Sequence, residues 1–389
     1  MTDLDCDVLV VGAGPAGSAL AAALARDGRD VLLVERRRHP RPKACAEYAS
    51  PRIAEELARL GMDAGWRHDA VSLAGMDVVR GEDRVRIGYR YRRAARSAWG
   101  LDRRTFDATL AAHAVASGAR LMDLTSLERV ERDGHRVIGA VLRTAGGRQM
   151  VMSRWVIGAD GARSSVSRAL GVDRASLPRR LGLVAHYEGH PELTDHGEMH
   201  VGPGWYVGLA PTPGGELNVG MALPLTGRGT ASSRFAAAIA GIPAVAERVA
   251  SLRRLTPIRG VAPIGHRVAR AAGDGWLLVG DAAGFIDPFT GEGIFRALRS
   301  ARAAADALRS GDADADARYL AARRGAFAAK DALTWLVQGM LAAPPLLGHV
   351  LRRLAADPIA ADRLGSALGD CRPATDALSP AFMASVLRP

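Results

Sequence analysis

The chain has 389 residues, of which 48% are hydrophobic and 24% are charged, so its composition is that of an ordinary globular protein and its length suits two interleaved domains. Its net charge of +11 would suit nucleic acid or an anionic membrane, but the arginines are scattered without interleaved aromatic residues, so we expect no nucleic-acid partner. Three widely separated cysteines argue against a disulfide framework and against a CxxC metal site, and we expect no metal.

The sequence also carries no sign of export or membrane insertion. The first residues are acidic and lead directly into an apolar run, which predicts that there is no signal peptide. No segment reaches about 18 uninterrupted apolar residues; residues 335–351 come nearest, but polar residues and prolines interrupt them. We therefore expect a cytoplasmic protein with no transmembrane segment, and we leave peripheral membrane contact and the oligomeric state open.

The first predicted element is an apolar strand at residues 8–11, followed by a glycine-rich turn and a helix-forming run at residues 18–26. In this context the first glycine permits a tight bend, the second lets the backbone approach a pyrophosphate, and the third lets the helix pack on the strand. The helix N-terminus then offers free N–H groups to phosphates. The residues expected to contact the phosphates are Gly12, Gly14, Pro15, Ala16 and Gly17.

A second apolar strand, at residues 31–34, ends in Glu35. This position is about 20 residues beyond the glycines, where a carboxylate is needed for a ribose hydroxyl. The pattern predicts a dinucleotide site that includes Glu35 and the adjacent Arg36; the alternative is that Glu35 is an ordinary surface acid.

Later segments alternate between helical and strand-like patterns. A half-buried antiparallel strand is expected near 76–97, where polarity alternates along the chain. Two short apolar strands, at 154–157 and 276–279, each end in a glycine turn like the first one. Further helices are expected at 51–60, 103–117, 293–310 and in most of the chain from 331 onward, and further strands at 130–151 and 180–224.

Three glycine-containing motifs thus follow buried strands: residues 12–17, Asp160-Gly161, and Gly280-Asp281 with the continuation through residue 294. In this order they resemble the FAD-dependent monooxygenase superfamily that includes the aromatic hydroxylases, over nearly the whole chain. The resemblance implies that Asp281 contacts the ribityl chain of FAD and that a helix N-terminus reaches the flavin ring, where it can stabilise negative charge. It assigns FAD contacts to Arg103, Asp160, Gly161, Gly280, Asp281, Pro288, Gly291, Glu292, Gly293 and Ile294.

A narrower resemblance points to the geranylgeranyl-reductase-like flavoproteins. The loop from Lys43 through Cys45 and Glu47 to Ser50-Pro51 resembles their K-x-C-G-E-x-x-S-P loop, except that Ala46 stands in place of the glycine. Residues 202–205, Pro211 and 218–220 match the same group. The resemblance implies that Cys45 lies near the flavin edge or in the substrate pocket; the alternative is that it is a small apolar filler.

The fold expected from these features is α/β: a Rossmann-like FAD-binding domain, an inserted antiparallel β-sheet substrate domain and a helical C-terminal tail. We expect the discontinuous FAD-binding domain to comprise residues 1–75, 98–178 and 257–330. The substrate domain then comprises 76–97 and 179–256, and the helical segment 331–389.

The substrate pocket has several candidate residues and no identified catalytic base. Cys45 is expected to face Trp205 and Tyr206 across the flavin, because the inserted strands must fold over the same end of the sheet. His186 is a candidate acid or base, as is His200, although both fit ordinary polar positions in a sheet.

These motifs predict FAD-dependent redox chemistry on a small hydrophobic molecule. The first hypothesis is a monooxygenase or oxidase that tailors a polyketide-like secondary metabolite; the second is a reductase of isoprenoid-type double bonds. A non-catalytic FAD-binding carrier is a third. The chain has only one GxGxxG, so NAD(P)H or a protein electron donor would act as a transient reductant.

Overall fold

The apolar runs near residues 10, 33, 156 and 278 form neighbouring strands of one eight-stranded sheet in the computed structural model, which describes residues 4–62, 64–189 and 195–388. β1 (Leu4–Val11) lies between β2 (Val31–Val34) and β12 (Gly147–Gly158), parallel to both, and β21 (Trp276–Leu278) is parallel to β12. The stretches 8–11, 31–34, 155–157 and 276–278 of these strands are apolar because a parallel sheet is buried on both faces. The remaining strands are β9 (Arg120–Met122), β10 (Ser126–Asp133), β11 (Arg136–Thr144) and β20 (Ala272–Gly273).

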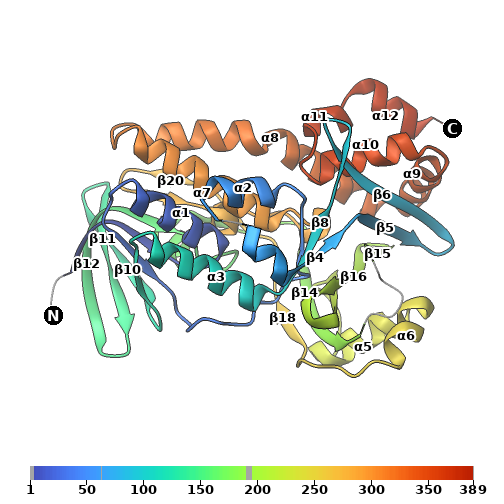
Figure 1. Cartoon of the computed structure of the whole chain (residues 1–389), viewed down its shortest axis with the longest axis horizontal. Coiled ribbons are helices and arrows are strands. Elements are labelled where there is room, and N and C mark those ends of the chain that lie inside the picture. Colours follow the sequence, from blue (N-terminus) through green and yellow to red (C-terminus); the bar gives the residue numbers. More distant parts are fainter. Residues whose placement is uncertain (1–3, 63, 190–194, 389) are drawn as a thin grey trace.

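Three helices form a layer on this sheet. α1 (Pro15–Arg26) packs against both α3 (Arg103–Ala116) and α7 (Gly293–Arg309) (Figure 1). α1 is rich in alanine and buried through most of its length, which allows the two neighbours to approach it closely. The FAD-binding fold expected from the glycine turns is therefore present. Shorter elements of the same half are α2 (Ile53–Arg59) and α4 (Ser165–Ala169).

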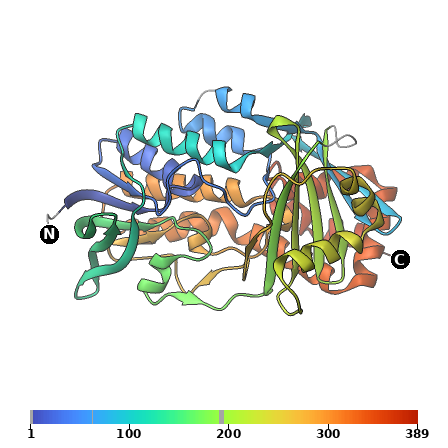
Figure 2. The same ribbon diagram turned by 90° about the horizontal axis from the view of Figure 1, so that it is seen from below.

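A second eight-stranded sheet stands beside the first, and Figure 2 shows its strands side by side between two layers of helices. Its strand order is β18-β14-β17-β16-β15-β5-β6-β7. All pairs are antiparallel except β15 with β5, which is parallel. Strand β5 belongs to a much earlier segment of the chain than β15. The bounds are β5 (Gly75–Arg80), β6 (Asp83–Tyr91), β7 (Ala94–Arg96), β14 (Arg180–Glu188), β15 (His196–Gly202), β16 (Trp205–Thr212), β17 (Glu216–Pro224) and β18 (Arg259–Val261).

The two faces of the second sheet pack against different helices. The outer face, with Leu183, Val207 and Leu217, packs on α5 (Ala231–Ala240) and α6 (Pro243–Ala250). The inner face, with Val201 and Tyr206, packs on the C-terminal helices. Those helices are α8 (Ala315–Ala342), α9 (Pro344–Ala356), α10 (Pro358–Leu368), α11 (Ala374–Ala377) and α12 (Pro380–Leu387).

Small elements connect the two sheets. β3 (Tyr48–Ala49), β8 (Ala98–Leu101) and β4 (Ala70–Leu73) form a three-stranded sheet, and β13 (Asp173–Arg174) pairs with β19 (Arg267–Val268). Strand β18 lies in the 257–330 segment yet pairs with β14 of the second sheet. We propose that the chain is divided into the expected FAD-binding, substrate and C-terminal segments.

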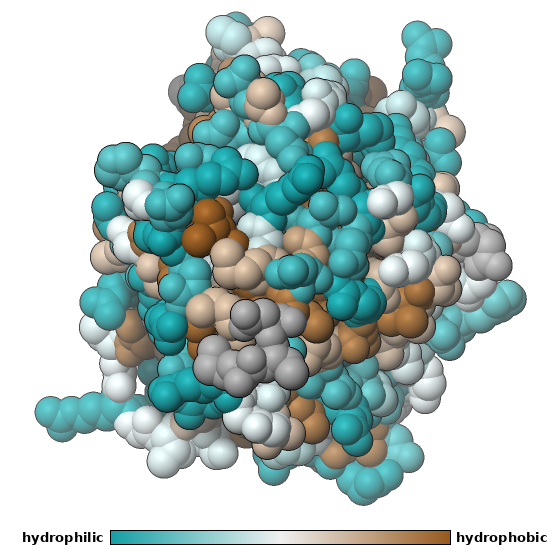
Figure 3. Space-filling view, turned by 90° about the vertical axis from the view of Figure 1, so that its left-hand side faces the viewer, coloured by the Kyte–Doolittle hydropathy of each residue, from teal (hydrophilic) through white to brown (hydrophobic). Residues whose placement is uncertain are grey.

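The surface at the N-terminal end of the molecule is mainly hydrophilic, with apolar residues in small groups between the polar ones (Figure 3). Within the described residues, none of the helices combines the length and hydropathy that a membrane crossing requires.

Candidate functional site

The glycine turn after β1 has the geometry that a phosphate site needs. Gly12 has a φ of +106°, and a Cβ there would lie 2.6 Å from the carbonyl oxygen of Ala159; a Cβ on Gly17 would lie 1.8 Å from that of Gly12. Neither position can hold a larger residue. Gly14 differs, because a Cβ there would meet only Arg41, at 3.7 Å. Gly14 is also the N-cap of α1 and brings no side-chain cap, so the helix leaves N–H groups for an anion beside open space.

Glu35 lies directly under this turn. It is 5% exposed, and its Oε2 accepts hydrogen bonds from the Ala13 N–H and from Arg41 Nη2, both at 3.1 Å. Among the described residues, Oε1 accepts only from the Arg37 N–H, at 3.2 Å. A carboxylate offers about four acceptor positions, so Oε1 retains capacity for a hydroxyl. The neighbouring Arg36 has an exposed side chain.

Two buried arginines share one carboxylate next to the turn. Asp107 is fully buried and accepts from Arg103 Nε at 2.8 Å and Nη2 at 2.9 Å. Arg41 Nη1 approaches the same carboxylate at 3.4 Å while Nη2 binds Glu35. Burial disfavours the charge of Arg103, but Asp107 overcomes this and raises the pKa of the guanidinium. The pair places fixed positive charge close to Gly14, where a pyrophosphate would need it.

Lys43 connects the two later glycine motifs. A Cβ on Gly161 would lie 3.3 Å from Lys43 Nζ, and the charge of Asp281 acts on the same ammonium group. Burial, together with the nearby Arg103, lowers the pKa of Lys43. Asp160 is engaged differently, because its Oδ2 accepts from Ser165 N at 2.6 Å and Ser165 Oγ at 2.7 Å.

The turn after β21 packs on the first glycine motif. Gly280 has a φ of +58°, and a Cβ there would meet the Ala16 side chain at 2.9 Å. The three motifs, far apart in sequence, therefore meet at one edge of the sheet, as their order predicted.

The loop that carries Cys45 is fastened to the second sheet by polar contacts. Asn218 of β17 donates from Nδ2 to the Cys45 carbonyl at 3.0 Å and to Glu47 Oε2 at 3.1 Å. His186 of β14, directly opposite Asn218, contacts the same Oε2 through Nε2 at 2.7 Å. Glu47 also accepts from the Arg103 N–H at 3.0 Å, and its φ of +58° is rare for a residue with a side chain.

The Glu47 carboxylate and the His186 imidazole contact each other through Oε2 and Nε2. Burial disfavours the imidazolium, but the hydrogen bond and charge of Glu47 overcome it and raise the pKa of His186. The side chain of His186 is 16% exposed whereas that of Glu47 is 3% exposed, so the pair connects a buried carboxylate with the surface.

The two aromatic pocket candidates lie on opposite faces of β16. Tyr206 is on the inner face, where its hydroxyl donates to Asp287 Oδ1 at 2.7 Å and its ring packs edge-on against Phe289. Trp205 packs with the cluster on the outer face, under α5 and α6. The expectation that Trp205 faces Cys45 is therefore corrected, because successive side chains of a strand point to opposite faces. His200 is also on the outer side, paired with Glu198 at 3.0 Å.

The turn that should reach the flavin ring is held from two sides. Arg180 of β14 binds Asp287 Oδ2 at 2.5 Å, just before Pro288 begins a short 3₁₀ turn (Pro288–Thr290). Gly291 has a φ of +67°, and a Cβ there would lie 2.8 Å from the Tyr48 ring. Gly293 then begins α7, with Ile294 buried behind it.

Glu292, next to Gly291, belongs to a buried charge network. Lys330 Nζ lies 3.2 Å from Glu292 Oε2 and 2.9 Å from Asp370 Oδ1. Burial opposes the ammonium charge, but the two carboxylates raise the pKa of Lys330. The C-terminal segment therefore helps to position the start of α7.

Sequence analysis assigned no role to several residues of this region. Two features of the sequence could have identified some of them. Lys43 and Lys330 are the only lysines of the chain, and both lie at the site. Asp107 closes the R-x-x-F-D pattern that begins at Arg103. Asn218 belongs to residues 218–220, which match the geranylgeranyl-reductase-like group, whereas Arg41 had no such signal.

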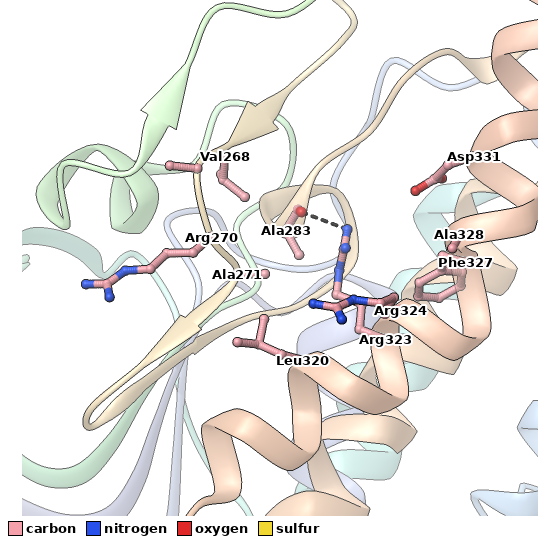
Figure 4. A pocket seen from close by; sticks show the side chains of 11 residues that line it. Val268, Arg270, Ala271, Ala283, Leu320, Arg323, Arg324, Phe327, Ala328 and Asp331 are labelled. Atoms are coloured by element: carbon pink, nitrogen blue, oxygen red, sulfur yellow. Dashed lines mark hydrogen bonds between the residues drawn. The ribbon is translucent and has the colours of Figure 1, made fainter.

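A separate pocket of about 280 Å³ lies between the 268–271 segment and α8. Figure 4 shows Arg323 reaching from α8 to the Ala283 carbonyl, with Phe327 and Arg324 beside it; the hydrogen bond measures 2.8 Å. None of the residues predicted to bind the cofactor lines this pocket.

Comparison with known proteins also indicates an FAD-binding protein. Residues 5–202 match the family model described as FAD binding domain. A menaquinone reductase of Mycolicibacterium smegmatis is 33% identical over 331 residues, covering 78% of this chain and 76% of that protein. Digeranylgeranylglycerophospholipid reductase 1 of Methanopyrus kandleri is 34% identical over 313 residues, covering 78% and 80%.

The fold is also found among solved structures. A geranylgeranyl bacteriochlorophyll reductase-like protein of Thermoplasma acidophilum superimposes with a TM-score of 0.79 at 23% identity, covering 100% of this chain and 97% of that one. At this identity the likeness concerns the fold alone. The two sequence relatives are both named as reductases, which favours the reductase hypothesis over the oxygenation that the sequence analysis put first.

Proposed function

We propose that this chain, which belongs to the FAD-binding domain family and to its geranylgeranyl-reductase-like flavoproteins, is an FAD-dependent reductase. Its reaction would saturate a double bond in the isoprenoid chain of a lipid. The observation that carries the proposal is the identity to two named lipid and quinone reductases over 78% of the chain. The Lys43–Glu47 loop supports it, because the second sheet holds this loop next to Arg103 and Asp107.

The residues around the three motifs fit FAD. The open space at Gly14, the free N–H groups of α1 and the buried Arg41 and Arg103 would hold the pyrophosphate. Glu35 would accept a ribose hydroxyl through Oε1, and Asp281 would contact the ribityl chain. The bound cofactor supplies the two-electron redox chemistry.

The other side chains would position substrate and exclude water. The inner face of the second sheet carries Tyr206 and Asn218, and Asn218 donates to the Cys45 carbonyl. Reduction of a carbon–carbon double bond consumes one proton in addition to a hydride. The Glu47–His186 pair, of which Glu47 is part of the Cys45 loop, would supply that proton.

A second candidate is oxygenation of a small hydrophobic metabolite. Ala46 supports it, because it replaces the glycine of the reductase loop and would touch a Cβ placed on Gly220 at 3.0 Å. The reductant in either reaction would be NAD(P)H or a protein electron donor.

Pre-reduced, FAD-loaded protein mixed with a polyprenyl lipid under anaerobic conditions tests the proposal. We expect flavin reoxidation coupled to a gain of two hydrogen atoms in the lipid, measured by absorbance and mass spectrometry. Reoxidation that requires oxygen and yields a product heavier by one oxygen atom would support the second candidate and contradict the first. A protein that takes up no FAD would contradict both.

A further inference from the structure

The end of α8 and the start of α9 form a part of the surface that lacks charge. From residue 332 to residue 351 the chain contains no Asp, Glu, Lys or Arg. Trp335 is 49% exposed and Leu346 is 39% exposed, so the solvent-facing side is apolar as well. We call this the α8–α9 strip, and its exposed members are Ala332, Trp335, Gly339, Ala342, Pro345 and Leu346.

The opposite side of the same helix is the ordinary buried side. Leu333, Val337 and Leu341 pack in the cluster that contains Tyr206 of the second sheet. The last turns of α8 are thus apolar around most of their circumference. A surface helix normally has a polar face, and a helix that is apolar all round is normally covered. The strip therefore indicates a contact that the isolated chain does not make.

The charge around the strip favours an anionic lipid surface as that contact. Arg324 is exposed on α8 and lies 11 positions, about three turns, before Trp335 on the same side of the helix. Arg353 is exposed on α9 and lies two turns beyond Leu346. The whole chain carries +11, so two copies repel each other, whereas an anionic membrane attracts the protein. Trp at an interface between apolar and polar layers is typical of membrane contact.

The strip is joined to the substrate side of the molecule. The Gly204 N–H of the turn before β16 donates to the Leu341 carbonyl at 3.3 Å, and Gln338 accepts from Arg180 at 2.6 Å. Arg180 in turn binds Asp287, at the turn that should reach the flavin ring. A surface seated on the strip would therefore be separated from the inner face of the second sheet by α8, whose buried side packs on that face.

We propose that the α8–α9 strip is the surface through which the protein docks on an anionic lipid membrane to take up its substrate. The inference rests on the proposed function for the identity of the substrate, but docking itself can be measured without turnover. No helix needs to cross the bilayer; Trp335 and Leu346 enter the interfacial region while the flanking arginines remain among the headgroups.

Flotation of the FAD-loaded protein with lipid vesicles tests this inference. We use phosphatidylcholine vesicles with or without about a quarter of phosphatidylglycerol, at low and high salt. The wild type should float with the anionic vesicles and less so at high salt. Trp335→Glu and Leu346→Glu should each lower the bound fraction about tenfold, because each places a carboxylate at the interface.

Val115→Glu is the matched control, since Val115 is 45% exposed on α3, far along the chain from the strip. It should bind vesicles like the wild type, and all variants should retain FAD. No flotation of the wild type, or equal flotation of all variants, overturns the inference. A wild-type dimer that Trp335→Glu converts to a monomer, with no vesicle binding, also overturns it and assigns the strip to a second copy of the chain.

Turnover of a short, water-soluble polyprenyl substrate separates this inference from the proposed function. Trp335→Glu should reduce this substrate at the wild-type rate and lose activity only on substrate held in vesicles. If the wild type floats but reduces no polyprenyl substrate, docking stands and the proposed function fails.

Discussion

Replacement of Asp107 by asparagine probes the two buried arginines at the centre of the candidate cofactor site. Asp107 is the carboxylate that Arg103 contacts with two nitrogens and that Arg41 approaches at 3.4 Å, and it is fully buried. Asp107→Asn preserves the size of the side chain but removes its negative charge. Both guanidinium groups are themselves buried, so water cannot replace the lost charge.

The expected loss follows from the cost of leaving a buried charge without its partner. Removal of one member of a buried ion pair typically costs about 3–5 kcal/mol, and the amide oxygen of asparagine still accepts one hydrogen bond. Arg41 also retains Glu35 at 3.1 Å. We therefore expect the lower end of that range, a decrease of about 3 kcal/mol in the free energy of unfolding of the cofactor-free protein.

Urea unfolding of the cofactor-free and FAD-loaded proteins measures this effect. Asp102→Asn on the same helix is the control: Asp102 caps α3 by accepting from the Arg104 N–H at 2.8 Å, so its substitution should cost at most about 1 kcal/mol. With FAD bound, the difference between wild type and Asp107→Asn should shrink, because phosphate oxygens give both arginines a new anionic partner. A loss no larger than that of the control would refute the reasoning about the buried pair. An undiminished difference with FAD would show that the pyrophosphate lies elsewhere.

Three further outcomes are expected. Asp281→Ala should lose most of its FAD on desalting whereas His196→Ala retains it, and equal flavin absorbance in both would contradict the role of Asp281. His186→Gln should destabilise the protein mainly at low pH: the folded pKa of His186 is raised above its ordinary value of 6.5, so the pairing with Glu47 stabilises fully below that pH and is lost as the pH rises through the folded pKa. Unfolding free energies that differ equally at all pH values would count against this pair. Cys45→Trp should abolish turnover with little loss of bound FAD; simultaneous loss of the flavin would place Cys45 against the cofactor rather than the substrate.

Local sequence patterns were sufficient to predict the four apolar strands of the first sheet and the meeting of the three motifs. Apolar runs that end in glycines predict buried parallel strands, and the carboxyl ends of such strands share one edge. Gly17 is also decided locally, because its close approach to Gly12 leaves no space for a Cβ, and Gly12 because of its positive φ. Glu35 could also be placed at this edge, because it follows the neighbouring parallel strand.

The side chains that gather around that edge could not be predicted from local patterns, because they come together through long-range packing. Trp205 and Tyr206 are adjacent and equally aromatic, and which of them faces inward depends on the register of β16 against its neighbours. Glu47 and Asn218 come from distant segments, and their pairing depends on how the second sheet lies against the first. The buried network of Glu292, Lys330 and Asp370 joins the flavin turn to the C-terminal helices. Local patterns carry periodicity and turn chemistry, whereas contacts between distant charged groups form only when packing brings them together and removes the water between them.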